Sequence, residues 1–216
     1  MRFLAVALFV FGFPLFGGGS RASAADPDEI TFPAVRTESG RSLMHALADR
    51  RSTRAFSPKE LASEVLGDLL WAADGVNRRD SGRRTAPSAR NMQEIEIYAA
   101  TARGLYLYDP AGHRLVRVLA EDIRPAVSRE GFAQNAPVTL IYVADHRKMT
   151  GTTVDEKEFY GATDAAFISQ NVYLYCASEG LATVVLGSFN RLDLTRAMRL
   201  DAAETVVLAQ PVGYAQ

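Results

Sequence analysis

The chain has 216 residues, of which 48% are hydrophobic and 23% are charged, and its formal net charge is -1. These proportions are those of a globular chain with a core of its own, and they exclude a largely disordered chain. The near-neutral charge gives no reason to expect nucleic acid or a membrane surface as a partner.

The first residues have the layout of an export signal. Arg2 precedes an apolar run over residues 3–16, and small residues follow at 22–24. This order predicts that residues 1–24 are a cleavable signal peptide. The alternative is an uncleaved N-terminal anchor, although the apolar run is short for a membrane span. We therefore expect a periplasmic or secreted protein, cut near Ala24, with no stable membrane span after cleavage.

Residues 25–40 are polar, contain two prolines and show no periodicity, so we expect a linker or an arm on the surface. The remaining residues, 41–216, are expected to form one domain. Within it, the stretch from Ser42 to Asp49 has the spacing of a short amphipathic helix.

A basic turn, Arg50-Arg51-Ser52-Thr53-Arg54, follows this helix. A guanidinium group presents a planar fork of donors that fits a phosphate, and it keeps its charge at all ordinary pH values. The basic turn therefore suits a phosphate group. The alternative interpretation is solvated surface charge, which is common for charged runs.

The next pattern predicts a helix and then a long loop. Ser57, Pro58 and Glu60 match the start of a capped helix, and Gly75 is placed to end it. Residues 74–90 are then expected to be a polar loop, of the length that is often functional in compact domains. It leads into a Pro-Ser loop, residues 87–93, whose polar side chains suit a tight turn beside a ligand.

The second half of the chain alternates between strand and helix patterns. Residues 138–144 form a continuous apolar run that suits a buried central strand. The helical stretch from Thr163 to Gly180 is apolar nearly all round, so it must be buried on several sides. Its Cys176, the only cysteine, is expected to be a buried and inert thiol. The other predicted elements are strands at 94–100, 105–108, 115–119, 183–186 and 205–209, and short helices within 121–131 and 192–200.

Three separated segments resemble the nitroreductase family of FMN-dependent oxidoreductases. They are the basic turn, the Pro-Ser-x-x-Asn-x-Gln pattern of the Pro-Ser loop, and the run Gly-Leu-Ala-Thr-Val-Val-Leu-Gly-Ser-Phe-Asn at 180–190. Their order also matches, and the resemblance covers roughly residues 42–213. It is closest to the branch with the SagB-type dehydrogenases, which share the runs Arg-Arg-Ser-x-Arg-x-Phe, Leu-Leu-Trp-Ala-Ala and Leu-Tyr-x-Tyr-Asp. The fold it implies is α+β, with a central mixed β-sheet flanked by helices, in a homodimer with an extensive interface.

The resemblance also implies an FMN site within a nitroreductase-like domain over residues 41–216. In the family, the first arginine and the serine of the basic turn serve the phosphate and ribityl end of the flavin. The last basic residue of that turn reaches the O2 edge of the ring, where it would stabilise negative charge. The Pro-Ser loop can come from the other subunit, and the third segment directs a backbone N–H at flavin N5. The matching positions are Arg50, Arg51, Ser52, Arg54, Pro87, Ser88, Asn91, Leu186, Gly187 and Ser188.

Two positions depart from the family pattern. The family often has proline after the glutamine of the Pro-Ser loop, where this chain has Glu94. Many members also bring a basic residue from the C-terminal segment to the phosphate, but no basic residue follows Arg199 here. Phosphate binding would then depend on Arg50, Arg51 and an arginine of the 78–90 stretch.

The implied function is an exported FMN-dependent oxidoreductase with ping-pong transfer through flavin N5 to a small organic acceptor, such as a nitro compound or a quinone. The chemistry belongs to the flavin, so no side chain is expected to be catalytic and no metal is required. NAD(P)H is left open as the donor, because nicotinamide nucleotides are scarce outside the cytoplasm. The alternatives are a non-redox binding protein with a degraded flavin site, a SagB-like azoline dehydrogenase, and an interaction domain unrelated to flavin.

Overall fold

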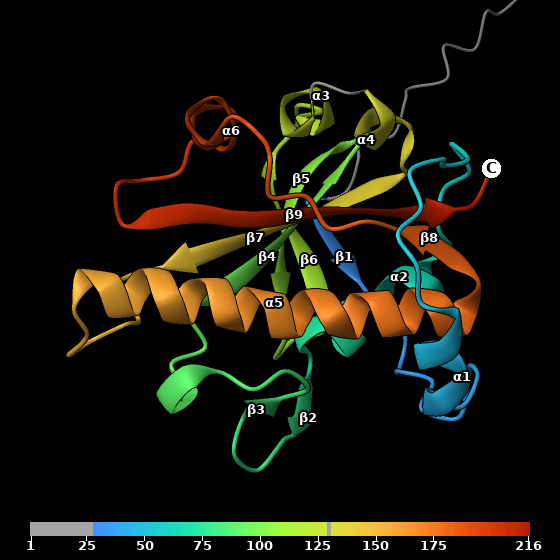
Figure 1. The fold of residues 1–216 in the computed structure, drawn as a ribbon, viewed down its shortest axis with the longest axis horizontal. Coiled ribbons are helices and arrows are strands. Elements are labelled where there is room, and N and C mark those ends of the chain that lie inside the picture. Colours follow the sequence, from blue (N-terminus) through green and yellow to red (C-terminus); the bar gives the residue numbers. More distant parts are fainter. Residues whose placement is uncertain (1–27, 129–130) are drawn as a thin grey trace, which may run out of the picture.

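A seven-stranded sheet forms the centre of the fold (Figure 1), in a computed structural model that describes residues 28–128 and 131–216. The strands lie in the order β1-β6-β5-β4-β7-β9-β8. Their bounds are Glu29–Thr31 for β1, Ile95–Thr101 for β4, Gly104–Asp109 for β5, Arg114–Leu119 for β6, Val138–Asp145 for β7, Leu181–Thr183 for β8 and Glu204–Tyr214 for β9. The predicted signal peptide, residues 1–24, lies outside the described residues.

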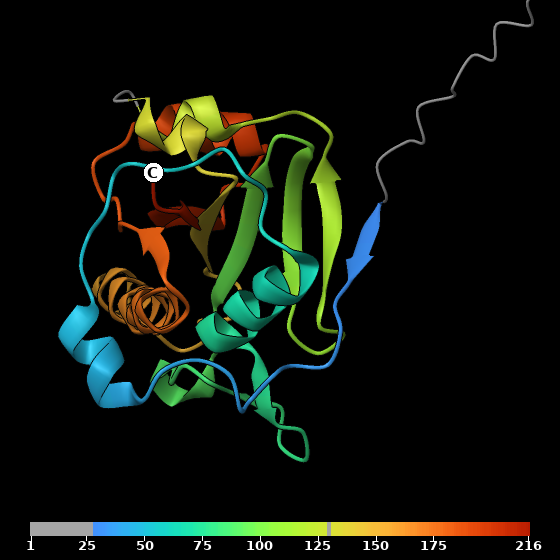
Figure 2. The ribbon, with the colours of Figure 1, turned by 90° about the vertical axis from the view of Figure 1, so that its right-hand side faces the viewer.

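Helices cover both faces of the sheet (Figures 1 and 2), as the α+β prediction requires. One face carries α2 (Ser63–Asp74) and α5 (Val154–Glu179), with α1 (Leu43–Asp49) packed on α5. The other face carries α3 (Arg124–Val127), α4 (Phe132–Asn135) and α6 (Arg191–Met198). Within the described part of the chain, no helix is both long enough and apolar enough to span a membrane.

Strand β7 is covered on both faces of the sheet, and every one of its residues is buried. Successive side chains of a strand point to opposite faces, so a strand covered on both faces must be apolar throughout. Leu140 and Tyr142 accordingly join the core under α2 and α5, while Ile141 and Val143 join the core under α6. The prediction of a buried central strand at 138–144 is confirmed.

One buried polar contact ties the sheet to α5. The Tyr142 hydroxyl donates to Gln210 Oε1 at 2.6 Å, and Gln210 Nε2 donates to the carbonyl oxygen of Ser169 at 3.4 Å. Tyr142 and Gln210 are both fully buried. Because buried polar groups are costly unless they are paired, these contacts fix the position of α5 over β7 and β9.

The structure refines several predicted elements. Every neighbouring pair of described strands is antiparallel, so the sheet is antiparallel rather than mixed. Part of the predicted arm is β1, which pairs with β6. Residues 74–90 contain a small hairpin of β2 (Val76–Arg78) and β3 (Arg83–Arg84), with a 3-10 turn, Ala89–Asn91, beyond it. The last strand continues to Tyr214, where 209 was expected.

Two helix starts were predicted at the wrong place. Helix α2 begins at Ser63, because Ser57 donates its N–H to the carbonyl of Tyr214 and the chain there lies extended along the C-terminal residues. Helix α5 begins at Val154, where Thr153 and Glu156 form a reciprocal capping box. The helix therefore starts nine residues before the predicted start at Thr163, in a stretch where Val154 and Phe159 are exposed.

Candidate functional site

A cavity of about 740 Å³ lies between the basic turn and the turn that follows β8. Arg54 contributes from the basic turn, and Leu186, Gly187 and Ser188 contribute from the other turn. Residues 125–128 and Phe132 form a further part of the lining. The structure therefore brings two of the three predicted segments together around one space, which we call the Arg54 cavity.

The hydroxyl group of Tyr173, in α5, joins these two segments. It lies 2.9 Å from Ser52 Oγ and accepts the backbone N–H of Val185 at 2.9 Å. The N–H of Thr53 also donates to the carbonyl of Thr183 at 2.9 Å. Sequence reasoning placed Tyr173 in an apolar helix and missed this role, although a buried tyrosine hydroxyl normally requires a polar partner.

The arginines of the basic turn carry charge that no carboxylate neutralises. Among the described residues, Arg50, Arg51 and Arg54 form no ion pair, and Arg50 instead lies over the Tyr173 ring, 5.3 Å from its centroid. Many other arginines of this chain do have a carboxylate partner: Arg36, Arg41, Arg84, Arg90, Arg103, Arg114, Arg117, Arg124, Arg147 and Arg199. Unpaired guanidinium groups beside a cavity favour an anionic ligand.

The turn at 186–188 offers an open stretch of backbone. The N–H of Leu186 is already used, since it donates to the carbonyl of Ala209 at 2.7 Å. Gly187 is exposed, and a Cβ atom added there would meet only Leu208 Cδ2, at 3.7 Å. Packing within the chain therefore does not require glycine, whereas the close approach of a ligand to the backbone would require it.

Arg51 lies apart from the Arg54 cavity. It lines a second cavity of about 450 Å³, together with Arg41, Thr183 and the C-terminal Gln216. The neighbouring Cys176 is buried, and burial raises the pKa of its thiol well above the ordinary value. The thiol is therefore protonated and unreactive, in agreement with the sequence.

The Pro-Ser loop, which holds Pro87, Ser88 and Asn91, lies on another part of α5. The N–H of Ala89 donates to Asp164 Oδ2 at 2.8 Å. Asp164 and Tyr173 are nine positions apart on α5, so they lie about 13 Å apart along its axis and on opposite faces. Within one chain, the Pro-Ser loop and the Arg54 cavity are therefore separate.

The Pro-Ser loop has an unusual backbone. Arg90, Asn91 and Gln93 all have positive φ angles, of 53°, 57° and 50°. Residues other than glycine rarely adopt this conformation, so a loop that contains three of them must be held by its contacts. Ser88 supplies one such contact, since its Oγ accepts the N–H of Gln93 at 3.0 Å.

The chain belongs to the nitroreductase family, whose family model matches residues 47–214. The chain is accordingly an oxidoreductase. A protein of Methanocaldococcus jannaschii that is named as a nitroreductase is 32% identical over 198 residues, which cover 87% of this chain and 97% of the relative.

Two solved structures extend the comparison. A protein of Ralstonia eutropha JMP134 whose crystal structure is described as that of a nitroreductase is 40% identical, with a TM-score of 0.85, and the match covers 88% of this chain and 90% of that one. The NADPH:FMN oxidoreductase of Vibrio harveyi has a TM-score of 0.60 at 17% identity, over 81% of this chain and 69% of that one. At that identity the likeness shows the fold alone.

Replacing Tyr173 with phenylalanine tests its bridging role. The Y173F variant leaves the N–H of Val185 without its partner, which should lower the free energy of unfolding by about 1–3 kcal/mol. Hydrogen exchange at Val185 should also become faster. The matched control is Y175F, which removes a hydroxyl that donates to the carbonyl of Val65 at 3.2 Å. The bridge is refuted if exchange at Val185 is the same in Y173F and in the wild type.

Proposed function

We propose that the chain is an FMN-dependent oxidoreductase that binds the flavin in the Arg54 cavity and passes electrons to a small organic acceptor. The observation that carries this proposal is the meeting, in one cavity, of the unpaired guanidinium of Arg54 and the open backbone at Gly187. Further support comes from the fold, which the Vibrio harveyi NADPH:FMN oxidoreductase shares. When bound, FMN would supply the chemistry, accepting electrons from a donor and passing them to an acceptor in separate half-reactions.

The residues of the chain would bind and orient the flavin. Arg50 and Ser52 suit the phosphate and ribityl end, since both lie beside Tyr173 and neither has a charged partner. Arg54 would place its positive charge beside the ring, where it favours negative charge on the flavin. The backbone at Gly187 and Ser188 would face the ring directly. Electrostatics and position are thus the contribution of the protein.

Flavin binding can be tested by absorbance. The purified mature chain should show a flavin band near ~450 nm, which NADH or NADPH would bleach if either is the donor. Losing one charged hydrogen bond costs about 1.5–3 kcal/mol, so R50Q and R54Q should each weaken FMN binding at least about tenfold. The control is R103Q, because Arg103 pairs with Glu60 at 2.8 Å, away from the Arg54 cavity. A colourless protein that does not bind added FMN would instead support the alternative of a non-redox binding protein with a degraded flavin site.

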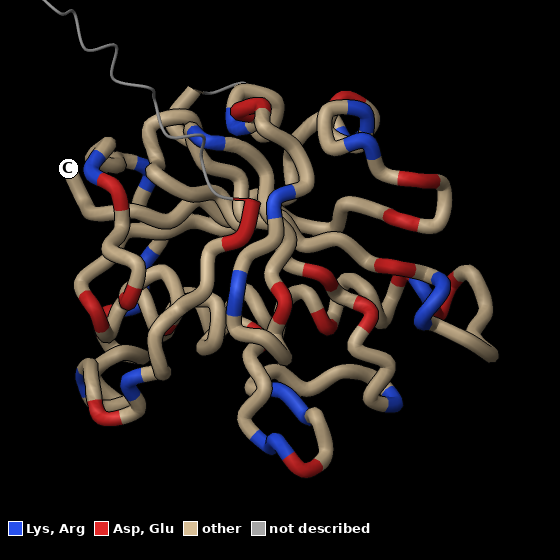
Figure 3. The backbone as a smooth tube through the Cα atoms, turned by 180° about the vertical axis from the view of Figure 1, so that it is seen from behind, with Lys and Arg blue, Asp and Glu red and all other residues tan. Residues whose placement is uncertain are grey.

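The second part of the proposal is a homodimer in which each Pro-Ser loop completes the partner's Arg54 cavity. The two lie apart in one chain, and a second copy could supply the missing loop. Helix α5 exposes Phe159 and Phe167, at 65% and 45%, and α1, which packs on α5, exposes Leu43 and Met44. An apolar surface of this kind is typical of a subunit interface. The β2–β3 hairpin, which precedes the Pro-Ser loop, is rich in arginine (Figure 3), and Arg78, Arg79 and Arg83 are exposed.

Light scattering can test the dimer. Replacing Phe159 and Phe167 with glutamate places charge on the apolar surface, and the variant should elute as a monomer that binds FMN at least about tenfold more weakly. The control is V118E. Val118 lies in β6 and is similarly exposed, at 43%. A double variant that stays dimeric and keeps its flavin would exclude this surface as the interface.

The third part of the proposal is export, which depends on the apolar run at 3–16. Expression of the full chain in a bacterium, followed by fractionation and mass spectrometry, should yield a periplasmic or secreted form that begins near Ala25. A cytosolic protein with an intact N-terminus would exclude export. If the protein is exported, the donor is expected to be a reductant other than NAD(P)H.

A further inference from the structure

Glu94, which follows the Pro-Ser loop at the position where the family often has proline, is buried without a hydrogen-bond donor. Its residue exposure is 0%, and neither carboxyl oxygen accepts a hydrogen bond from a donor group of the described residues. A buried carboxylate that accepts no hydrogen bond is strongly disfavoured, whereas a protonated carboxyl group is tolerated. The position therefore favours the neutral form of Glu94.

The charged groups around Glu94 are mostly acids. Asp164 of α5 and Asp74 of α2 are buried, at 3% and 5% exposure, and both line a small cavity of about 10 Å³ with Pro87 and Ser88. Arg84, in β3, is the nearby cation, but it forms an ion pair with Asp74. Three buried carboxyl groups with one paired cation nearby favour the protonated form of at least one of them.

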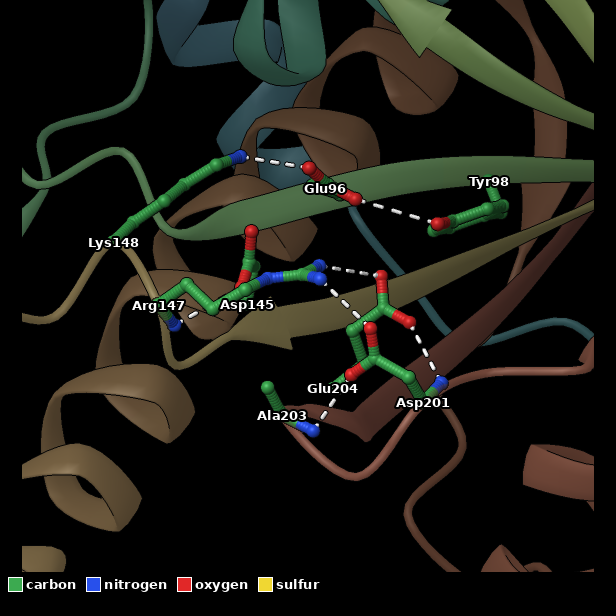
Figure 4. A network of polar contacts seen from close by, with 8 residues as sticks. All are labelled: Glu96, Tyr98, Asp145, Arg147, Lys148, Asp201, Ala203 and Glu204. Carbon is green, nitrogen blue, oxygen red and sulfur yellow. Dashed lines mark hydrogen bonds and ion pairs between the residues drawn. The ribbon is translucent and has the colours of Figure 1, made fainter.

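The next acid along the chain, in β4, shows the contrast. Glu96 pairs with Lys148 at 2.7 Å and accepts the Tyr98 hydroxyl at 3.3 Å (Figure 4). In the same network, Arg147 donates to Asp145, Asp201 and Glu204. Each of these carboxylates has a donor, and Lys148 is already engaged by Glu96. No free cation is thus left for Glu94 among the described residues.

We propose that Glu94 keeps its proton in the folded protein and donates it in a hydrogen bond to the carboxylate of Asp164, and that this acid–carboxylate pair positions the Pro-Ser loop. Asp164 would then hold the loop near both ends. Its Oδ2 accepts the N–H of Ala89 near the start of the loop, and its carboxylate faces Glu94 at the end. Glu94 is a positioning residue in this proposal.

The ionisation of Glu94 agrees with this arrangement. Burial first, and then the adjacent Asp164 and Asp74, raise the pKa of the Glu94 carboxyl group from 4.5 to about 7. Burial likewise raises the pKa of Asp74 to about 7, against the pull of Arg84. We call the loop closed when it is packed as in this structure and open when it is locally unfolded. A raised carboxyl pKa means that the closed loop holds a proton that the open loop would release.

The raised pKa of Glu94 makes closure of the Pro-Ser loop depend on pH. Below about pH 4.5 both forms of the loop carry the proton, so pH has no effect on closure. Between about pH 4.5 and 7 the open loop loses the proton and the closed loop keeps it, so closure weakens as the pH rises. Above about pH 7 both forms are ionised and the effect levels off.

Hydrogen exchange of the protein without FMN tests the proposal independently of the proposed function. Protection of the peptide over residues 86–94, corrected for the intrinsic pH dependence of exchange, should fall about tenfold per pH unit between pH 5 and 7. E94Q keeps a donor for Asp164 but cannot ionise, so it should lose most of this slope. E96Q is the matched control, two residues further along the chain, and should keep the wild-type profile. Equal slopes in the wild type and E94Q would overturn the proposal.

A second measurement takes its decisive result from the wild-type protein, so it does not require a variant to fold. In wild-type protein with carbon-13-labelled glutamate side chains, one carboxyl resonance should titrate near pH 7, well above the ordinary glutamate range. E94Q should remove that resonance and E96Q should retain it. A titration in which no glutamate carboxyl group has a midpoint above about pH 6 would refute the shared proton.

Discussion

The site depends on α5 and on two polar side chains that it carries. Tyr173 joins the basic turn to the turn after β8, and Asp164 holds the Pro-Ser loop. Both contacts are made by buried groups, so each is strong and specific in direction. Because the two residues lie on opposite faces of one rigid helix, the helix also sets the distance between the segments it holds. That distance is why a single chain does not assemble all three segments around one cavity.

Charge is distributed unevenly over the molecule. Away from the basic turn, many arginines are matched with carboxylates, as in the Arg147 network at the start of β9. In that network, burial acts to raise the pKa of Asp145, but the hydrogen bonds from Arg147 outweigh it and hold the pKa below its ordinary value. Among the described residues the basic turn has no carboxylate partner, and the surroundings of Glu94 contain acids in excess. These two unbalanced places adjoin the basic turn and the Pro-Ser loop.

Much of the fold could be predicted, because apolar periodicity reports burial directly. The run at 138–144 required a strand covered on both faces, and β7 is such a strand. The end of α5 at Gly180 could be predicted as well, since Gly180 takes the left-handed conformation that often ends a helix. Helix starts were less predictable. The pattern at Ser57 suits a cap, but pairing with the C-terminal residues overrides this local preference.

The site could be predicted only as separate segments. Spacing identified the basic turn and the turn at 186–188, but not the wall formed by residues 125–132 or the bridging hydroxyl of Tyr173. These depend on contacts between residues far apart in the sequence, which periodicity does not report. Glu94 could be noticed as a departure from the family pattern, yet its lack of a hydrogen-bond donor is visible only in three dimensions.

The C-terminal residues and the basic turn lie side by side (Figures 1 and 2). Phe56 pairs with Ala215, and the N–H of Gln216 donates to the carbonyl of Ala55 at 3.4 Å. Strand β9 is made last during synthesis, yet it pairs with β7 in the middle of the sheet and borders the basic turn. The cavities beside the basic turn therefore cannot take shape until β9 has been synthesised. An affinity tag joined to Gln216 would likewise lie beside the second cavity, which Gln216 lines.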